Sequence, residues 1–506
     1  MASQRDIGFS AAIGIGVLLA GWCGTARGAL PEYADFQLQV RSNIVDGFNL
    51  PAGSSFNSGT PALSDQGVAT IRLLVVGGSG RAGLWYGGDG TGSVVYQAPV
   101  DRLLGDASIN GAGQVVFEQS LDFQSEGVYR YDPSGGATVP AVPVGGPFGI
   151  EGFADPQIND AGEIGFRADR GSFQAYLRDV GGTQTQYATE GGGIAFLFVA
   201  QFNNASQLAG KVRLGSTAES QPDEIRRYEA DGSFTRIAVD DDGDPGSPFV
   251  GFQNSVGIAD NGWVAFVANL AQGSGVFASD GTTTLTIATS ADPEVSSIDF
   301  FGPVINDRGW VAFRAFDESG LRAIFVGDGT DLRRVVTEHD LVPTDLGPGR
   351  IDQHDSSPVF GGSVDINAAG DVAFAAALTP AGNNQIEWGS GVFVAHAQDP
   401  AGVSESAFDV RSGVRVWPNP FRDVVRVAWR SGGDGTSLRW AGVHDVRGRL
   451  VRVLGNDADT NAPEDDRSTL AWDGTDESGR DVGAGVYFVT VRTDRGLAES
   501  KVLRVQ

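Results

Sequence analysis

Residues 305–313 read INDRGWVAF, and this nine-residue phrase returns along the chain with asparagine second, glycine fifth and phenylalanine ninth. The other full copies read INGAGQVVF (109–117), INDAGEIGF (158–166) and INAAGDVAF (366–374), and the degenerate copies read LSDQGVATI (63–71), FNNASQLAG (202–210) and IADNGWVAF (258–266). The fifth position falls at 67, 113, 162, 206, 262, 309 and 370, at intervals of 44 to 61 residues. Self-similarity on this scale indicates a propeller or a solenoid.

Each part of the phrase has a physical role. Asparagine followed by glycine three positions later is typical of a type I turn, and the asparagine side chain can hydrogen-bond the backbone two residues on. After the glycine the chain becomes extended, with large apolar residues such as Val311 and Phe313 separated by a small one, Ala312. A strand that is apolar on both faces has a sheet packed against each face, as in the blades of a propeller.

The order of strands predicts how the ring closes. After each copy we expect a second strand, a third strand and then a Gly/Pro-rich crossing such as residues 242–252. The seventh repeat has its second strand at 391–397 but no third strand before the chain changes character at 399. Residues 36–40, ahead of the first copy, have the pattern of a third strand. We therefore expect them to complete the last blade of a seven-bladed propeller, because an open solenoid needs polar caps instead.

Composition excludes one class of partner. The chain has 506 residues, 73 of them glycine, which suits many short strands joined by tight turns. Acidic residues number 63 against 36 basic ones, giving a net charge of −27. Nucleic acid is therefore not expected as a partner, because binding phosphate requires a positive surface. The negative charge keeps a secreted protein soluble.

The first 28 residues have the pattern of a secretory signal. Arg5 precedes an apolar stretch at 7–20, and small residues precede Ala29, where we expect cleavage. A retained anchor fits less well, because the apolar stretch is short for a membrane span. The single cysteine, Cys23, lies in this leader, so the mature chain is expected to have no disulfide. No other stretch is apolar over a sufficient length to cross a membrane as a helix, so no transmembrane segment is expected in the mature chain. We expect export to the cell surface or medium of a Gram-negative-type bacterium.

The sequence thus divides into four parts. Residues 1–28 form the signal peptide, 29–397 the propeller, 398–413 a polar linker and 414–506 a second domain. The alternating strands of the second domain predict a small antiparallel sandwich of about 90 residues. The predicted fold class is all-β, a seven-bladed β-propeller followed by a small Ig-like β-sandwich.

Both domains resemble known families. With their N-x-x-G-x-x-x-F copies, residues 57–397 resemble exported bacterial tandem-repeat proteins of the choice-of-anchor type, a resemblance that implies location and architecture but no activity. Residues 414–506 resemble the Ig-like domain of flagellar hook-capping proteins and the sorting domain of type IX secretion cargo. The matching marks, in order, are Trp417-Pro418-Asn419-Pro420-Phe421, Gly448, Trp472-Asp473-Gly474, Gly479, Gly485-Val486-Tyr487-Phe488 and Lys501-Val502-Leu503.

The second resemblance implies a role for the C-terminal domain. A sorting domain implies passage across an outer membrane through the secretion machinery, followed by attachment to the surface or release. The long hairpin within 472–488 is closer to the hook-capping type than to the shorter sorting type. Sorting, anchoring and spacing are therefore the expected roles.

Two acidic loops are candidate calcium sites. They contain Asp240, Asp242 and Asp244 in the first loop and Asp457, Asp459 and Asn461 in the second. Calcium takes about six to eight oxygen ligands, and carboxylates at alternate positions can supply several of them. The alternative is that both are solvated acidic loops. No other cofactor is expected.

Motifs for catalysis are missing from the sequence. The four histidines form no zinc-binding spacing, and no G-x-S-x-G elbow occurs. His339 and His354 share an acidic crossing that can bind a metal or supply a base, with solvated loop histidines as the alternative. The acidic neighbours there are Glu338, Asp340, Asp352 and Asp355. Trp263 and Trp310 occupy one repeat position, which favours packing between blades over a sugar-binding rim.

We therefore expect a non-catalytic binding or structural propeller, with a surface glycan or a protein as its partner. The alternative is a glycan-active hydrolase or lyase, because propellers also host such enzymes and fold alone does not decide function. Hydrolases of this kind need paired carboxylates at a defined separation. Carboxylates and aromatics clustered at the propeller mouth would favour the enzyme.

Overall fold

The computed structural model describes most of the chain. In the first part these are residues 29–42, 47–56, 59–217, 220–353 and 358–398, and in the second part 414–417, 421–422, 424–430, 438–445, 449–456, 467–493 and 496–505. The predicted signal peptide and residues 399–413 of the predicted linker lie outside the described residues. The chain divides into two compact units, Met1–Pro400 and Ala401–Gln506.

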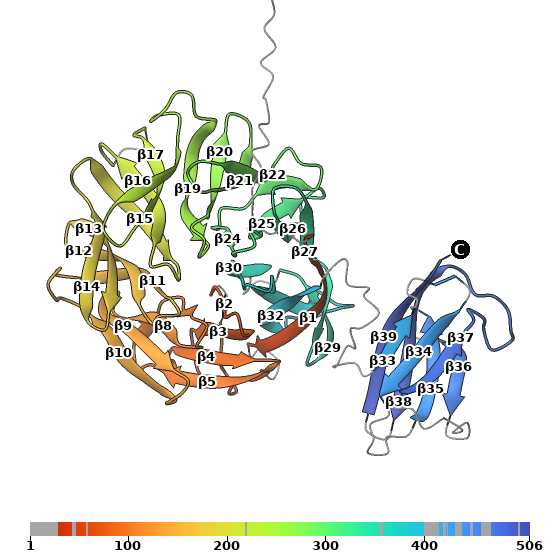
Figure 1. The fold of residues 1–506 in the computed structure, drawn as a ribbon. Helices are drawn as coiled ribbons and strands as arrows, with labels where there is room; N and C mark the ends of the chain where they lie inside the picture. Colours follow the sequence, from red (N-terminus) through yellow and green to blue (C-terminus); the bar gives the residue numbers. More distant parts are fainter. Residues whose placement is uncertain are drawn as a thin grey trace, which may run out of the picture. The chain divides into compact units, whose positions relative to one another are not determined.

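Within the described ranges, the first unit contains seven antiparallel sheets arranged as the blades of a ring (Figure 1). Blade 1 contains β2 (Ala62–Leu63), β3 (Val68–Leu73), β4 (Gly83–Gly88) and β5 (Thr91–Gln97). Blade 2 contains β6 (Arg102–Leu104), β7 (Ser108–Ile109), β8 (Val115–Leu121), β9 (Gln124–Asp132) and β10 (Ala137–Pro143). Blade 3 contains β11 (Gly152–Ile158), β12 (Ile164–Arg170), β13 (Phe173–Val180) and β14 (Thr183–Thr189).

The remaining blades follow in chain order. Blade 4 contains β15 (Ile194–Phe202), β16 (Leu208–Leu214), β17 (Asp223–Tyr228) and β18 (Phe234–Val239), and blade 5 contains β19 (Phe249–Ile258), β20 (Val264–Leu270), β21 (Ser274–Ser279) and β22 (Thr284–Thr289). Blade 6 contains β23 (Val295–Ile298), β24 (Val304–Ile305), β25 (Val311–Asp317), β26 (Arg322–Gly327) and β27 (Leu332–Thr337). Blade 7 contains β28 (Leu341–Thr344), β29 (Gly347–Ile351), β30 (Phe360–Ile366), β31 (Val372–Pro380), β32 (Gly389–Gln398) and β1 (Glu32–Arg41). The fold is a seven-bladed β-propeller.

The repeated phrase joins the innermost strand of a blade to the second strand. In blade 3, for example, the turn at Asn159–Gly162 connects β11 to β12. The sequence predicted a Gly/Pro-rich crossing ahead of each phrase, but that segment contains the innermost strand, as β19 shows for residues 249–258. The innermost strands escaped prediction because they are interrupted and carry polar residues, which hides the alternating pattern.

Glycine is favoured at the turn by backbone geometry. Gly309 has φ +74°, in the left-handed region that glycine adopts without a steric penalty. The degenerate copy in blade 4 has Ser206 at this position, and its φ of +58° lies in the same region. The turn therefore keeps its shape in the blade whose sequence departs from the phrase.

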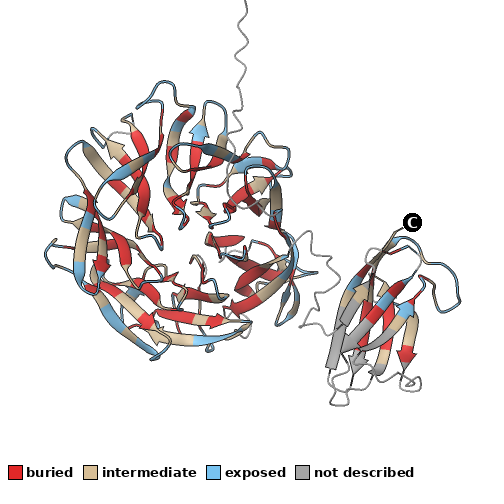
Figure 2. Ribbon diagram, in the orientation of Figure 1, coloured by how far each residue is buried: buried red, intermediate tan, exposed pale blue. Residues whose placement is uncertain are grey.

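The second strands form the core between blades (Figure 2). Val311, Phe313 and Ala312 are all buried, so both faces of β25 are covered. Ala312 and Trp310 pack in a cluster with residues of blade 7, whereas Phe313 packs with residues of blade 5. The prediction of strands apolar on both faces is confirmed, and Trp310 packs between blades.

Both ends of the propeller sequence meet in blade 7. Strand β1 pairs antiparallel with β32, with Phe36 opposite Ala395 and Leu38 opposite Phe393. Arg41 at the end of β1 is fully buried, and its guanidinium lies 2.8 Å from a carboxylate oxygen of Asp345. The predicted ring closure by the N-terminal strand is confirmed.

The second unit consists of two antiparallel sheets. One contains β33 (Val414–Trp417), β34 (Val425–Arg430) and β37 (Arg467–Trp472), and the other contains β35 (Leu438–Asp445), β36 (Leu450–Asn456), β38 (Gly485–Thr493) and β39 (Gly496–Arg504). Buried residues of both sheets share one core that includes Val427, Val443, Trp472 and Val489. The unit is therefore a small β-sandwich. Across the described ranges, no helix is long and apolar enough to cross a membrane.

Deleting residues 29–41 should destabilise the propeller by several kcal/mol, because Leu30, Leu38 and Val40 are buried and each contributes roughly 2 kcal/mol. Thermal unfolding of the deleted and full chains measures the effect. The double variant Glu32→Ala/Asp35→Ala is the control, since both side chains are exposed and the strand remains. A melting temperature that is the same for the deletion and the control contradicts ring closure by β1.

Candidate functional site

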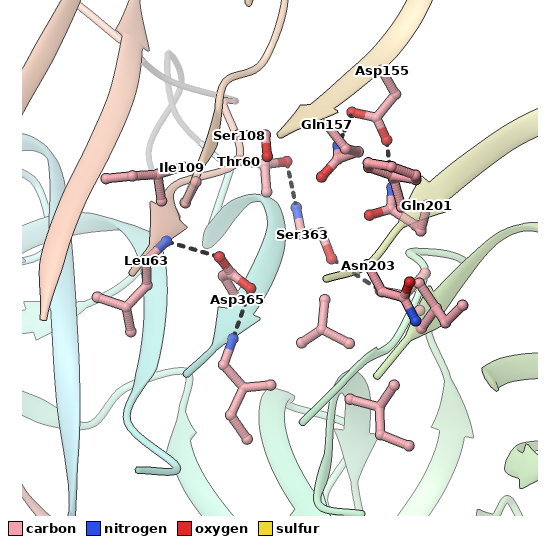
Figure 3. A pocket seen from close by; sticks show the side chains of 18 of the residues that line it. Thr60, Leu63, Ser108, Ile109, Asp155, Gln157, Gln201, Asn203, Ser363 and Asp365 are labelled. Atoms are coloured by element: carbon pink, nitrogen blue, oxygen red, sulfur yellow. Dashed lines mark hydrogen bonds between the residues drawn. The ribbon is translucent and has the colours of Figure 1, made fainter. Parts of the chain in front are cut away.

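The space inside the ring is a cavity of about 820 Å³, called the channel below. Residues of all seven blades line it, contributed by the innermost strands and by the turns of the repeated phrase. Figure 3 shows part of this lining, with Asp155 and Asp365 hydrogen-bonded to neighbouring residues.

Each innermost strand from blade 2 onward is interrupted at mid-length. The pairing register shifts between Ala154 and Gln157 in blade 3, and blades 4, 5 and 7 have shifts at the corresponding place. In blades 2 and 6 two short strands replace one. Bulges redirect side chains and often occur beside functional sites. Proline and glycine occur at these interruptions, as with Pro156 and Gly302, and they place Asp155 and Phe300 at the channel wall.

The chemistry of the lining is acidic and amide-rich. Its carboxyl groups belong to Asp65, Asp106, Glu118, Asp155, Asp160, Asp260, Asp307 and Asp365. Asparagine and glutamine side chains from five blades accompany them. Among the described lining residues there is no lysine, arginine or histidine. The channel is therefore rich in hydrogen-bond acceptors and negative in charge.

Asp155 lies half-buried at the break in β11. The Nε2 groups of Gln157 and Gln201 donate hydrogen bonds to its two oxygens at 3.0 and 2.5 Å. Burial, and to a lesser extent the nearby Asp106 carboxylate, raises the pKa of Asp155 to about 6. Because Gln201 belongs to β15, the carboxyl group also connects blade 3 to blade 4.

Asp365 connects blade 7 to blade 1, as Asp155 connects blade 3 to blade 4. Its two oxygens accept hydrogen bonds from the backbone N–H groups of Leu63 at 2.8 Å and Ile366 at 2.9 Å. Burial raises the pKa of Asp365 to about 7 in spite of these bonds, and Asp65 adds to the rise. Near neutral pH this carboxyl group is therefore partly protonated.

Three long cationic side chains lie behind the channel wall. Arg167, Lys211 and Arg314 occupy the same position of the second strand in blades 3, 4 and 6. Each donates to a backbone carbonyl of the next blade's interrupted strand, the acceptors being Leu197 at 3.3 Å, Phe252 at 3.1 Å and Phe360 at 3.3 Å. Each cation also forms an ion pair with a carboxylate outside the lining, namely Asp169, Asp223 or Asp299, so these charges do not neutralise the channel.

The asparagine of the phrase connects neighbouring blades at one mouth of the channel. Its Oδ1 accepts from the backbone of its own turn, as expected, for example from Gln114 N to Asn110 at 2.9 Å. Its Nδ2 donates to the backbone carbonyl at the equivalent position of the next blade. The distances are 2.9 Å from Asn110 to Asn159, 3.5 Å from Asn159 to Asn203, 2.9 Å from Asn203 to Ala259 and 3.0 Å from Asn306 to Asn367.

The segment that follows this position makes a second set of contacts at the same mouth, at five of the seven blade junctions within the described ranges. The backbone N–H of one blade donates to the side chain of the next. The donor and acceptor pairs are Gly111 to Asp160 at 2.6 Å, Asp160 to Asn204 at 2.7 Å, Asn204 to Asp260 at 2.7 Å, Asn261 to Asp307 at 3.1 Å and Ala368 to Asp65 at 2.7 Å. The main chain thus fixes the positions of four mouth carboxylates. Burial raises the pKa of one of them, Asp260.

The lining also contains apolar side chains, such as Phe202 and Ile258, and one exposed aromatic ring. Phe300, at the break between β23 and β24, is 68% exposed. Its ring stacks on Phe301 with centroids 4.5 Å apart, and the Arg314 guanidinium lies 4.0 Å from the centroid of Phe301. The Phe300 ring therefore presents a supported apolar face to the channel.

The first calcium candidate lies outside the channel lining. The two oxygens of Asp240 accept from the backbone N–H groups of Asp223 and Gly243, and Asp242 is exposed. Asp244 accepts from the Gly246 N–H at 2.9 Å. The second candidate loop, with Asp457, Asp459 and Asn461, lies outside the described residues. Calcium binding at these loops stays a prediction.

The structure brings together three residues of the acidic crossing that contains His339 and His354. Ligand atoms of Glu338, His339 and Asp352 lie within 4.8 Å of one another. Guanidinium groups already pair with both carboxylates, since Arg322 lies 3.6 Å from Glu338 and Arg350 lies 3.1 Å from Asp352. His354 and Asp355 lie outside the described part of the chain.

Comparison with protein families and curated proteins gives little beyond the fold. Residues 202–407 match a family described as "Family of unknown function (DUF7453)". No curated protein matches the sequence.

Several solved structures show weak likeness. An oligogalacturonate lyase in complex with manganese is 9% identical with a TM-score of 0.45, over 73% of this chain and 99% of that one. A puromycin-hydrolysing peptidase of Mycobacterium tuberculosis is 13% identical with a TM-score of 0.37, over 78% and 60%. The fucose-specific lectin of Aleuria aurantia is 12% identical with a TM-score of 0.35, over 56% and 97%. At these values the likeness carries no argument about function.

The Asp365 carboxyl group should make stability depend on pH. Its folded-state pKa of about 7 exceeds the unfolded value of about 4, so its contribution is fully present below pH 4 and is lost as the pH rises through 7. Asp365→Asn loses one of the two acceptors at every pH, but its stability relative to wild type should rise between pH 4.5 and 8, on the order of a few kcal/mol, because the amide does not titrate. Melting temperatures across this range measure the difference.

Thr60→Val is the matched control for this prediction. It removes the hydrogen bond from Ser363 N to Thr60 Oγ1 at the same junction without touching a titratable group. Its difference from wild type should stay constant with pH. An Asp365→Asn difference that is equally constant shows that the carboxyl group does not titrate in this range.

Proposed function

We propose that the protein is an exported, non-catalytic binding propeller that holds a glycan in its channel. The observation that carries the proposal is the cavity of about 820 Å³, lined by carboxyl and carboxamide groups around one exposed aromatic pair. Pockets that orient a ligand through a few convergent polar groups are the usual binding sites of proteins.

The lining suits a polyhydroxylated ligand. Sugar hydroxyl groups donate and accept hydrogen bonds, which matches carboxylates that accept and amides that do both. The exposed face of Phe300 offers a surface for the apolar face of a sugar ring. A protein partner at the channel mouth is the other partner considered above, but the recessed polar lining favours the glycan.

The polar groups with raised pKa values have structural partners. Asp365 receives two backbone N–H groups, and Asp155 receives two glutamine amides, so both carboxyl groups hold neighbouring blades together. No histidine is among the described residues that line the channel. These contacts favour binding over catalysis.

A glycan-active hydrolase or lyase is the second candidate. The raised pKa values of Asp155 and Asp365 favour it, because a carboxyl group that remains partly protonated near pH 6 or 7 can act as a general acid. The clustering of carboxylates with an aromatic pair in the channel is also the feature that the sequence analysis associated with an enzyme.

The proposal also includes export of the protein and a role for its C-terminal module. Residues 1–28 have the pattern of a signal peptide, and the exported tandem-repeat family that 57–397 resemble supports the same location. Residues 414–506 serve sorting, anchoring or spacing as an Ig-like module, through the outer-membrane secretion machinery if the resemblance to sorting domains holds. The separate core of the second unit supports an independent module.

Replacing Phe300 by alanine should weaken glycan binding about fivefold without lowering stability, because the ring is exposed and an aromatic contact contributes roughly 1 kcal/mol. Calorimetry of the full chain against oligomers of glucose, N-acetylglucosamine, glucosamine and galacturonate measures it. Phe123→Ala is the control, since Phe123 is 85% exposed and does not line the channel.

Each outcome decides between the candidates. If no oligomer binds, or if both phenylalanine variants behave alike, the binding proposal fails. If the chain releases new reducing ends from an oligomer, and Asp155→Asn or Asp365→Asn stops release while binding persists, the enzyme is the correct function.

Removing residues 414–506 should leave the propeller folded but change where it accumulates. In a Gram-negative host, an epitope-tagged chain without this module should stay in the periplasm, whereas the full chain reaches the surface or medium. Cell fractionation and protease treatment of intact cells measure this, and a chain without 1–28 gives the cytoplasmic reference. Identical surface exposure with and without 414–506 rules out the sorting role.

A further inference from the structure

Among the described residues that line the channel, all charged side chains are acidic. Eight lining carboxyl groups meet no cationic side chain among the described lining residues. Of these groups, Asp106 is the one that forms an ion pair within the described ranges, with Arg72. The nearby cations Lys211 and Arg314 pair with Asp223 and Asp299 outside the lining. A cavity lined by one sign of charge concentrates ligands of the opposite sign.

The fold does not require this charge at the mouth. Asn204 accepts the backbone N–H of Asp160 at 2.7 Å, and Asp260 accepts that of Asn204 at the same distance. A neutral amide therefore connects two blades as well as a carboxylate does. Nevertheless four of the five acceptors in this set of contacts are aspartates, so the structural role leaves the negative charge unexplained.

We propose that the ligand of the channel is a cationic glycan, an oligosaccharide that carries primary amino groups. This inference rests on the proposed glycan-binding function and adds the charge of the ligand. Ammonium groups donate charge-assisted hydrogen bonds to carboxylates, which are about twice as strong as neutral ones. The sugar ring stacks on Phe300 while its amino groups reach the carboxylates.

The spacing of the carboxylates favours an extended ligand over a metal ion. The mouth aspartates belong to different blades, one to each, and each accepts a backbone N–H of another blade. The Asn204 side chain lies between two of them and donates to Asp160 at 3.2 Å and to Asp260 at 2.8 Å. Among the described residues, the group compact enough for a metal is Glu338, His339 and Asp352, which does not line the channel. Charges repeated along a sugar chain match charges distributed around a ring.

The test compares three hexasaccharides on the full chain at pH 6 by calorimetry. The probes are β-1,4-linked glucosamine, its N-acetylated form and galacturonate. The glucosamine hexamer should bind at least tenfold more tightly than the acetylated hexamer, and galacturonate should not bind. Raising the salt concentration should weaken binding of the glucosamine hexamer but not that of the acetylated hexamer, because salt screens the attraction between opposite charges.

A charge variant locates the effect. Asp65 and Asp307 each accept their inter-blade backbone hydrogen bond through a single oxygen, so Asp65→Asn/Asp307→Asn can keep both bonds. This variant should lose about tenfold affinity for glucosamine and little for the acetylated hexamer. Asp122→Asn/Asp331→Asn removes the same charge from exposed positions outside the channel and should change neither.

The outcomes separate this inference from the function on which it rests. If the acetylated and free glucosamine hexamers bind with equal affinity, and Phe300→Ala weakens binding of both, the glycan-binding function stands and the cationic ligand is overturned. No binding of any hexamer overturns both. Hexalysine that binds as tightly as the glucosamine hexamer overturns the glycan in favour of a basic peptide. Equal losses in the two double variants show that net charge, and not the channel, is responsible.

Discussion

The propeller depends on one side chain used in two directions. The asparagine of the repeated phrase accepts backbone N–H groups of its own turn through Oδ1 and donates through Nδ2 to the main chain of the next blade, as Asn203 does. A blade cannot change its turn without releasing its neighbour, because both contacts belong to one amide. The turn therefore fixes both the local backbone and the contact with the next blade. These contacts set the geometry of the channel mouth.

The pairing of the cations explains why the channel is acidic. Lys211 and Arg314 donate to backbone carbonyls of the next blade and form ion pairs with Asp223 and Asp299, so their charges are neutralised outside the lining. The mouth carboxylates accept main-chain N–H groups instead, and within the described ranges no ion pair neutralises them.

The sequence allowed prediction of those features that depend on neighbouring residues. The turns, the doubly buried second strands and the closing strand at 36–40 follow from local patterns. The innermost strands could not be predicted, because their interruptions remove any period. Asp155 and Asp365 carried no signal either: Asp365 meets Leu63, 302 positions away in the chain, and its burial exists only in the closed ring. The aspartates that follow the phrase asparagine can be read from the sequence, but the hydrogen bonds that they accept from backbone N–H groups of the adjacent blade cannot.

The closing strand also sets the order of folding. Residues 32–41 are synthesised before the other strands of the propeller, yet their partner strand ends at Gln398. Until that strand has been synthesised, the first strand has no partner in the sheet and the ring cannot close. Unpaired strand edges favour aggregation and proteolysis. The native propeller therefore forms only after its last strand has been made, and a chain truncated before that point keeps an open edge.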